Sequence, residues 1–171
     1  NHSCNLWFIQ AAETLKPQIF YDYIQAFGFT QPTGIDLPNE TRWTSVYNAE
    51  QMAEVDTNLY TAAFGQNESI TPMQMATAVA AIANGGYLVT PYVVDSITDS
   101  EGNVVQKTET NIRRQVISEE VSEQILAMME TSVDPNSESP GDYHSNKNAY
   151  VAGYRIGGKS GTGEQLDWKG A

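Results

Sequence analysis

One segment of the chain carries both a start and a stop signal for a helix, and a hairpin pattern follows it directly. Thr71 can cap the helix, and Pro72 suits its first turn because a proline there loses no helical hydrogen bond. The run Asn84-Gly85-Gly86 ends the helix. Residues 87–109 then place β-branched residues on both sides of the turn sequence Ser-Glu-Gly-Asn, which predicts a β-hairpin. The sequence therefore predicts a helix and a hairpin in direct succession.

Other helices are predicted on both sides of this unit. The spacing of apolar residues predicts one helix over 6–15, capped by Asn5, and a break at Lys16 before a second helix that begins at Pro17. Ser118 is expected to cap a further helix. Some residues of two helices are expected to face the interior. They are Met75, Ala78, Val79 and Ile82 in the helix before the hairpin, and Val121, Ile125, Met128 and Met129 in the helix after Ser118.

The remaining segments are less regular. Residues 29–47 contain several prolines and glycines, which predicts a loop. For residues 48–63 the pattern leaves both helix and irregular structure open. Residues 134–148 are polar and include two prolines, so a long loop is predicted there. Residues 149–162 alternate in character, which predicts a strand that would carry Lys159.

The composition fits a single globular domain. The chain has 171 residues, of which 40% are hydrophobic and 18% are charged. Its formal net charge of −12 argues against a nucleic acid partner, because phosphate binding needs a basic surface. The single cysteine, Cys4, excludes an internal disulfide. The longest apolar run, near residues 76–83, is far shorter than the roughly 20 residues that span a bilayer.

The run GGKSGTG at residues 157–163 places a lysine and two hydroxyls between glycines. One interpretation is a phosphate-binding loop, because residues 153–160 match G-x-x-x-x-G-K-S, although the glycines that follow are unfavourable for the helix such a loop opens. A second interpretation is a glycine-rich surface turn. A third is an anion-recognising strand, in which the ammonium of Lys159 and the hydroxyls of Ser160 and Thr162 hold a carboxylate.

The third interpretation gains support from Ser3-Cys4-Asn5 near the other end of the chain. By itself, Ser-x-Asn is a common helix cap. Together with Lys-Ser-Gly at 159–161, it resembles two of the three motifs of the penicillin-binding proteins and serine β-lactamases. The third motif of that set is a Ser-x-x-Lys nucleophile, and no serine of this chain has a lysine three residues later.

Five further stretches resemble the same family, and they occur in the family's order. They are TGIDLPNE at 33–40, AFGQ at 63–66, ITPMQMA at 70–76, IANGG at 82–86 and VAGYRIGGK at 151–159. Each stretch is short, but the ordered set is specific. The chain most resembles the monofunctional, class B penicillin-binding proteins, which include division and sporulation members.

The resemblance implies an α+β fold, namely part of the serine β-lactamase and penicillin-binding-protein transpeptidase fold. A helical region would lie beside part of an antiparallel sheet. Residues 1–171 are expected to be an incomplete transpeptidase domain, without the Ser-x-x-Lys segment, which should precede Ser3, and without the last strands. Such a piece is expected to be inactive alone, and the open edges of its sheet would favour association with a neighbour.

The resemblance also implies the activity of a peptidoglycan D,D-transpeptidase. An activated serine attacks D-Ala-D-Ala in a stem peptide, and an amine of a second stem peptide releases the acyl-enzyme; β-lactams acylate the same serine. The implied catalytic residues are Ser3, which passes a proton toward the leaving nitrogen, Asn5, which orients the substrate, and Lys159, which supplies positive potential. The implied substrate-binding residues are Ser160, Gly161 and Thr162, with the N–H of Thr162 in the oxyanion hole.

The implied partners are peptidoglycan stem peptides and β-lactam antibiotics. No cofactor or metal is implied, and His2 and His144 are too few for a convincing metal site. The parent protein is expected to be anchored in the bacterial membrane, on its extracytoplasmic face, within a cell-wall synthesis complex. Three alternatives remain open: a non-catalytic penicillin-sensing receptor domain of the same fold, a phosphate-loop nucleotide binder, and a thiol enzyme that pairs Cys4 with a histidine.

Overall fold

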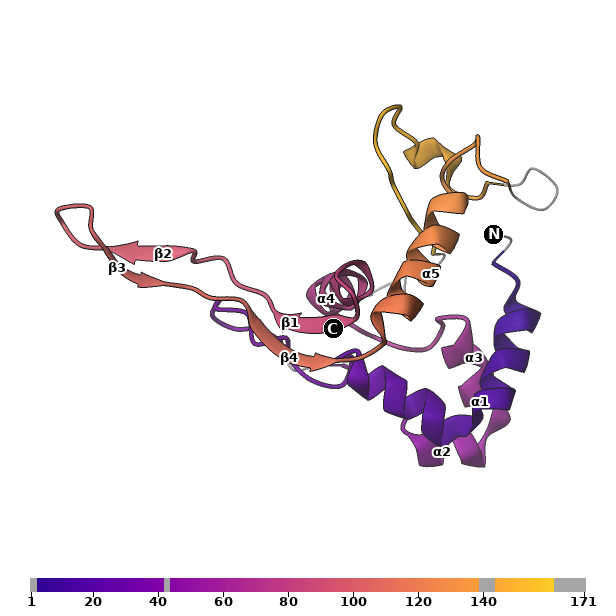
Figure 1. Cartoon of the computed structure of the whole chain (residues 1–171). Helices are drawn as coiled ribbons and strands as arrows, with labels where there is room; N and C mark the ends of the chain where they lie inside the picture. Colours follow the sequence, from indigo (N-terminus) through magenta and orange to yellow (C-terminus); the bar gives the residue numbers. More distant parts are fainter. Residues whose placement is uncertain (1–2, 42–43, 139–143, 162–171) are drawn as a thin grey trace, which may run out of the picture.

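The computed structural model describes residues 3–41, 44–138 and 144–161 of the chain (Figure 1). These residues form helices and two small antiparallel sheets, so the chain has an α+β fold. The elements in order are α1 (Asn5–Ala26), α2 (Ala49–Glu54), α3 (Asp56–Ala63), α4 (Pro72–Ala83), β1 (Tyr87–Thr90), β2 (Ser96–Thr98), β3 (Val104–Lys107), β4 (Asn111–Gln115), α5 (Glu119–Thr131) and the 3-10 turn η2 (Lys147–Ala149).

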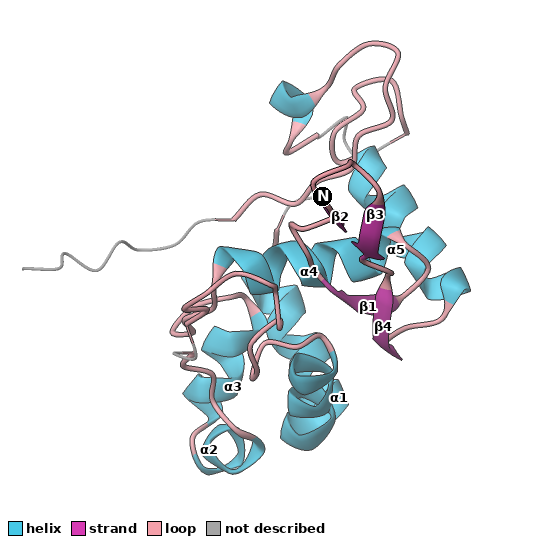
Figure 2. Cartoon of the chain, turned by 90° about the vertical axis from the view of Figure 1, so that its left-hand side faces the viewer, coloured by secondary structure: helices cyan, strands magenta, loops and turns pink. Residues whose placement is uncertain are grey.

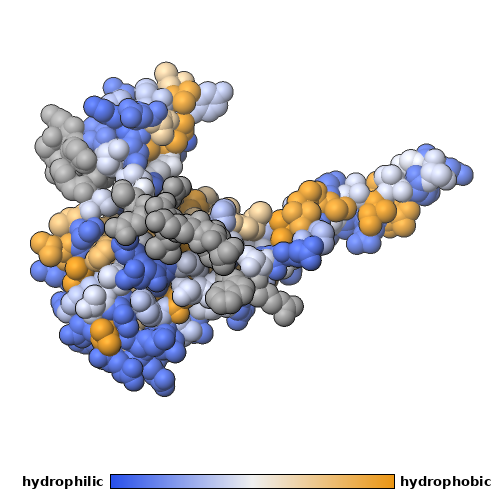
Figure 3. Space-filling model, turned by 180° about the vertical axis from the view of Figure 1, so that it is seen from behind, coloured by the Kyte–Doolittle hydropathy of each residue, from blue (hydrophilic) through white to orange (hydrophobic). Residues whose placement is uncertain are grey.

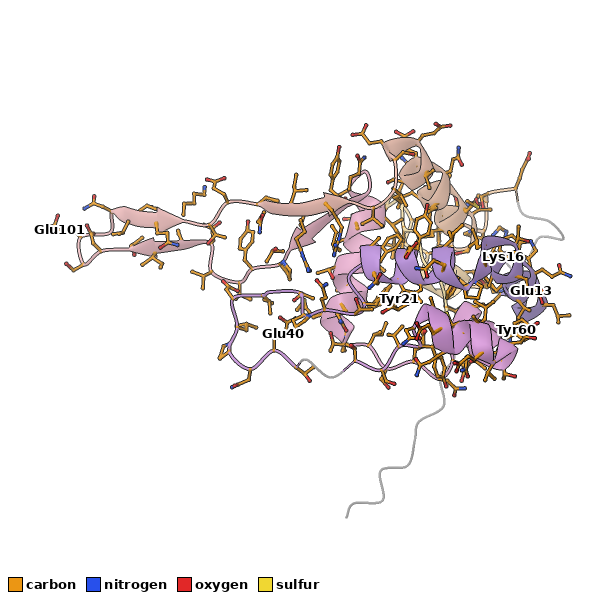
Figure 4. The ribbon with its side chains drawn as sticks, turned by 90° about the horizontal axis from the view of Figure 1, so that it is seen from below. Glu13, Lys16, Tyr21, Glu40, Tyr60 and Glu101 are labelled. Carbon is orange, nitrogen blue, oxygen red and sulfur yellow. The ribbon has the colours of Figure 1, made fainter. Side chains whose placement is uncertain are left out.

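The helices α1, α2 and α3 form the helical base of the molecule and lie apart from α5 (Figure 2). Their shared core is built from small and flexible side chains: the buried members are Ala12, Met52, Leu59 and Ala62. The predicted break in α1 is confirmed, because Lys16 has φ 71° and ψ 153° and Pro17 follows it. At the periphery, the Tyr60 hydroxyl donates to the Glu13 carboxylate at 2.7 Å (Figure 4).

Helix α4 begins and ends where the sequence predicts. The Thr71 hydroxyl accepts from the N–H of Gln74 at 3.1 Å, and the Gln74 side chain accepts from the N–H of Thr71 at 2.8 Å, which is a complete capping box. Gln74 is also buried, and its amide donates to the carbonyl of Gln31 at 2.9 Å. The Gln74 side chain therefore both caps the start of α4 and connects the loop after α1 to this helix.

The predicted inner face of α4 is only partly right. Ala78 is buried, but Met75 and Val79 are 45% and 42% exposed. The buried stripe instead runs through Gln74, Thr77, Ala78 and Ala81. Helical spacing identifies the two faces of a helix, but here both faces carry apolar residues, and the packing of β1 and the loop decides which one is covered.

The predicted hairpin is confirmed, because β2 pairs with β3 in antiparallel fashion. The sequence did not reveal that β1 pairs with β4, which joins residues from either end of the hairpin into a second two-stranded sheet. Residues 91–109 therefore form a hairpin arm that projects from the body, with Glu101 at its tip (Figures 1 and 4). Its surface carries exposed apolar side chains, Val104 and Val105 among them (Figure 3).

The loop TGIDLPNE at residues 33–40 makes hydrogen bonds that connect it to the hairpin arm. The two carboxylate oxygens of Asp36 accept from the N–H groups of Val93 and Val94, at 2.8 and 2.9 Å, and so tie the loop to the root of the hairpin arm. These backbone donors hold the pKa of Asp36 below its usual value. Glu40 (Figure 4) in turn accepts from the N–H and hydroxyl of Thr33, both at 2.6 Å.

Helix α5 begins at its predicted cap, since the Ser118 hydroxyl accepts from the N–H of Val121 at 3.2 Å. Its predicted inner face is partly wrong: Val121 is 39% and Met128 is 61% exposed, and Ser122 is the buried residue of the helix. The predicted loop after α5 contains only the short turn η2 among its described residues.

The predicted strand over 149–162 is not present in its described part, residues 149–161. In that part of the chain, no neighbouring strand offers a ladder of hydrogen-bonding partners to this segment. The N–H of Gly158 donates to Met129 of α5, and the N–H groups of Tyr150 and Tyr154 donate to carbonyls three residues earlier. The segment is thus irregular because its backbone groups bond within local turns and to the end of α5 rather than to a sheet.

One half-buried carboxyl between α3 and α4 predicts an unusual dependence of stability on pH. Burial raises the pKa of Glu68 to about 7, and one of its carboxylate oxygens is buried without a hydrogen-bonding partner. Because the usual value is 4.5, folding takes up a proton at this group between these two pH values. The free energy of unfolding should therefore fall as pH rises from about 4.5 to about 7, and stay low above that range.

We expect Glu68→Gln to stabilise the protein at pH 8 by about 1–2 kcal/mol, after allowance for solvent screening of a partly exposed side chain, and to change little at pH 4.5. Urea unfolding at the two pH values measures this difference. Glu54→Gln, at the exposed end of α2, is the matched control and should show no such pH dependence. An equal effect of both substitutions at pH 8 would contradict the assignment to Glu68.

Candidate active site

A groove of about 710 Å³ lies between the start of α1, the turn after α3, helix α4 and the segment that follows η2. Its polar end is formed by both of the clusters that the sequence analysis singled out. The polar lining residues are Ser3, Asn5, Lys159 and Ser160, and the apolar wall is formed by Phe8, Phe64, Met75, Val79 and Met129. The exposed face of α4 is therefore a wall of this groove, which explains why Met75 and Val79 are not in the core.

The structure brings Ser3 and Lys159 into direct contact. The ammonium of Lys159 donates to the hydroxyl of Ser3 at 2.9 Å, although the two residues are 156 positions apart in the chain. Lys159 also donates to the carbonyl of Ser160. A hydroxyl that accepts from an ammonium is a short route for a proton, and the charge beside it favours an anion in the groove.

The Ser3-Cys4-Asn5 stretch is not the helix cap that its sequence suggests. Cys4 occupies the capping position with extended backbone angles, it makes no capping bond with its side chain, and Asn5 is already the first residue of α1. The side chains of Ser3 and Asn5 are thus available to the groove that they line. Ser3 has φ 48°, a left-handed conformation that is unfavourable for residues other than glycine and that clusters at functional sites.

The glycines before Lys159 let the chain approach α5 closely. A Cβ atom on Gly157 would lie 3.1 Å from the Cβ of Met129 and 3.3 Å from the backbone nitrogen of Glu130. A side chain at this position would therefore push the segment away from the helix. Gly158 follows, and its N–H donates to the carbonyl of Met129 at 3.2 Å. The two glycines place the backbone of Lys159 at the rim of the groove.

An exposed ion pair holds the same segment further upstream. Arg155 donates to the two carboxylate oxygens of Glu130 at 2.8 and 2.7 Å. The hydrogen bond from Arg155 lowers the pKa of Glu130, and that of Arg155 is raised in return. The Arg155 side chain is 86% exposed, so water screens this pair strongly. The two parallel hydrogen bonds therefore set the orientation of the Arg155 guanidinium more than they add to the stability of the protein.

The other predicted site residues are placed as follows. Ser160 and Gly161 continue along the groove beside Lys159, and Thr162 lies outside the described residues. A phosphate-binding loop that begins at Gly153 would follow a strand. The residues before it, 144–152, contain the turn η2 and no strand. Cys4 is exposed and is not among the residues that line the groove.

The described part of the chain offers no cluster of three or more His, Cys, Asp or Glu side chains that could bind a metal ion. The groove therefore presents one ammonium, hydroxyls and an amide as its polar groups. Among the described helices, none combines the length and the apolar character that crossing a membrane requires.

Comparison with known proteins identifies the family. The family profile described as the penicillin binding protein transpeptidase domain matches residues 1–171. The chain belongs to this family. Stage V sporulation protein D of Bacillus subtilis is 40% identical over 169 residues, which is 96% of this chain and 24% of that protein. A peptidoglycan D,D-transpeptidase FtsI homolog of Mesostigma viride is 26% identical over 179 residues, with 96% of this chain and 28% of that protein covered.

Solved structures of the family share the fold. Penicillin-binding protein 3 of Mycobacterium tuberculosis in complex with ampicillin superposes with a TM-score of 0.81 at 25% identity, over 96% of this chain and 35% of that chain. A D,D-transpeptidase domain from Eggerthella lenta has a TM-score of 0.80 at 23% identity, which shows the fold alone. The chain spans about a quarter of the length of the curated relatives it matches.

The sequence predicted the residues at the polar end of the groove, but it did not predict those of the apolar wall or those that hold the Lys159 segment. Met75, Val79 and Met129 were assigned to the core, and Ser132 and Asn146 were not noticed at all. The available signal was the apolar character of both faces of α4, since a helix that is apolar on two sides needs a second neighbour or a cavity. For Ser132 and Asn146 the sequence carried no signal, because both side chains bind the carbonyl of Gly158, which is distant from them in the chain.

Proposed function

We propose that this chain is part of a peptidoglycan D,D-transpeptidase that forms a serine acyl-enzyme and is acylated by β-lactams. The observation that carries the proposal is the 2.9 Å contact between Lys159 and Ser3 at the polar end of a groove. It supports a site in which an acyl centre, a proton route and an anion-binding group lie together. Membership of the family, and the relatives named as transpeptidases or solved with β-lactams, point to the same chemistry.

The proposed mechanism assigns each groove residue a task. A serine of a Ser-x-x-Lys segment attacks the D-Ala-D-Ala carbonyl, and Ser3 passes the proton that the leaving nitrogen takes up. Asn5 donates its amide to the side amide of the substrate and orients the lysine of that segment. Lys159 supplies positive potential, and Ser160 and Thr162 hold the terminal carboxylate of a stem peptide or a penicillin. The amine of a second stem peptide then takes the acyl group and frees the serine.

We also propose that the 171 residues are the middle to late part of the transpeptidase domain. The Ser-x-x-Lys segment would precede Ser3, and further strands would follow residue 171 and pair with the segment that carries Lys159. The support is that the chain covers only 35% of a solved family member. We further propose that the longer protein is anchored in the bacterial membrane, acts on its extracytoplasmic face and works in a cell-wall synthesis complex.

The test uses the full-length protein that contains this chain. We expect a fluorescent penicillin to label it covalently, with the adduct mapped by mass spectrometry to a serine outside residues 1–171. A stem peptide with an amine acceptor should then yield free D-alanine and a cross-linked product. Labelling without any turnover of stem peptide would instead indicate a penicillin-sensing receptor domain. Absence of a covalent label, or an adduct on Cys4, would refute the proposed function.

A further inference from the structure

The backbone carbonyl just before Lys159 is bound by two side chains. The peptide bond between Gly158 and Lys159 sets the direction in which the lysine side chain leaves the backbone. Its carbonyl oxygen, on Gly158, accepts from the hydroxyl of Ser132 at 2.7 Å and from the side-chain amide of Asn146 at 3.2 Å. Two side chains from different parts of the loop after α5 therefore converge on the single group that aims Lys159.

The two donors also hold each other. The amide of Asn146 donates to the Ser132 hydroxyl at 2.9 Å, and the N–H of Asn146 donates to the Ser132 carbonyl at 2.9 Å. Ser132 is 4% exposed. Its hydroxyl also lies 2.8 Å from the carbonyl of Met129, so its one proton serves either that carbonyl or Gly158, while Asn146 fills its lone pair. Ser132 is thus shielded from water, whereas Asn146 is partly exposed and its amide also lies 3.2 Å from the hydroxyl of Ser145. Within such a network each hydrogen bond polarises the others.

Nothing else among the described residues fixes this carbonyl. No described strand pairs with residues 149–161, and a strand of the longer protein would pair through other groups, because the Gly158 carbonyl already accepts two hydrogen bonds. The ion pair of Arg155 with Glu130 lies three residues upstream and is exposed to water, which leaves it loose. The N–H of Gly158 is bonded to the carbonyl of Met129, but it belongs to the preceding peptide plane and so does not orient the Gly158 carbonyl. The pair of Ser132 and Asn146 does orient it.

We propose that Ser132 and Asn146 are positioning residues for Lys159: by binding the Gly158 carbonyl, they hold the ammonium within hydrogen-bonding distance of Ser3. This inference rests on the proposed function, because it concerns the same site. It goes beyond that function in assigning a role to two residues outside the motifs. A misplacement of a catalytic group by about 1 Å can lower a rate about a hundredfold, so small shifts of this carbonyl are enough to matter.

Two substitutions in the full-length protein test the proposal. Ser132→Ala removes one donor to the Gly158 carbonyl with little change of volume. Asn146→Asp keeps the shape of the side chain, replaces its donor with an acceptor, and draws the Ser132 proton away from Gly158. The controls are Ser137→Ala, whose hydroxyl bonds to the carbonyls of Thr131 and Asp134, and Asn148→Asp, which adds the same charge at an exposed position.

The measurement is the time course of acylation by a fluorescent penicillin, which yields a rate constant and the fraction of molecules that can be labelled. We expect the rate constant to fall about 10- to 100-fold in Ser132→Ala and Asn146→Asp, with the labelled fraction unchanged. The double variant should be little slower than the worse single one, because both changes release the same carbonyl. The preference for a free penicillin over its carboxylate ester should also shrink, since Lys159 and Ser160 move with it.

The outcomes separate the inference from the function on which it rests. A lower labelled fraction with an unchanged rate constant would show a purely structural role and overturn the proposal, as would variants that react as fast as both controls. Crystal structures of the two variants give a readout that needs no activity. They should show the Lys159 ammonium withdrawn from the Ser3 hydroxyl; an unchanged contact would overturn the inference even if the protein reacts with penicillin.

Discussion

Replacing Gly86 with alanine is expected to abolish stable folding of the protein. Gly86 has φ 93°, and a Cβ atom there would lie 1.9 Å from the backbone carbonyl oxygen of Ile117. That oxygen cannot move aside alone, because hydrogen bonds hold the two backbone segments close together. The carbonyl of Gly86 accepts from the N–H of Val116 at 2.7 Å, and the N–H of Gly86 donates to the carbonyl of Ala81 at 2.8 Å. A clash between two backbones at such a distance destabilises by more than about 4 kcal/mol.

The matched control is Gly102→Ala at the tip of the hairpin arm. Gly102 has φ 87°, but nothing lies within 4 Å of a Cβ atom built on it. The control therefore carries only the left-handed backbone penalty, about 1–2 kcal/mol. Urea unfolding followed by circular dichroism measures both variants. If Gly86→Ala were no less stable than Gly102→Ala, the close crossing of Gly86 and Ile117 would be wrong.

The sequence predicted those elements whose signals are local. The capping box of Thr71 and Gln74, the break at Lys16 and the cap at Ser118 each depend on residues within a few positions of one another. The β2–β3 hairpin is equally local, since its turn chemistry lies between its strands. In all these cases the same side chains that carry the signal also make the hydrogen bonds that form the element.

The sequence failed where the partner lies far away in the chain. The pairing of β1 with β4 joins strands separated by the whole hairpin arm, so no turn signal announces it. The sequence could not tell which face of α4 is buried, because Met75, which is exposed, and Ala78, which is buried, are both apolar. The strand expected over 149–162 is absent from its described part, residues 149–161. The residues do alternate in character, but a strand forms only where another strand offers its hydrogen bonds.

The candidate site was predicted from resemblance rather than from local chemistry. Ser3-Cys4-Asn5 alone indicated a helix cap, and the structure shows that this local interpretation is incorrect. Only the combination with Lys159 suggested that the two ends of the chain meet. Their 2.9 Å contact agrees with that hypothesis about position, whereas the roles of the residues stay predictions until acylation is measured.

Replacing Lys159 with methionine is the second large effect that we expect. Methionine keeps the length and the apolar stem of the side chain and removes the ammonium that donates to Ser3. Loss of a preorganised charge or of a proton route lowers rates by roughly 10²–10⁴-fold, so acylation by a fluorescent penicillin should slow by that order. Lys147→Met, at an exposed position of η2 in the same segment, is the control and should react at the unaltered rate.

Lys159→Arg then separates the two tasks that a lysine can perform here. If Lys159 acts only through its charge, arginine should retain much of the rate, because its guanidinium is also positive and can donate to Ser3. If Lys159 must release and regain a proton, arginine should be as slow as methionine, because a guanidinium does not lose its proton in proteins. A methionine variant as fast as the Lys147 control would remove Lys159 from the mechanism altogether.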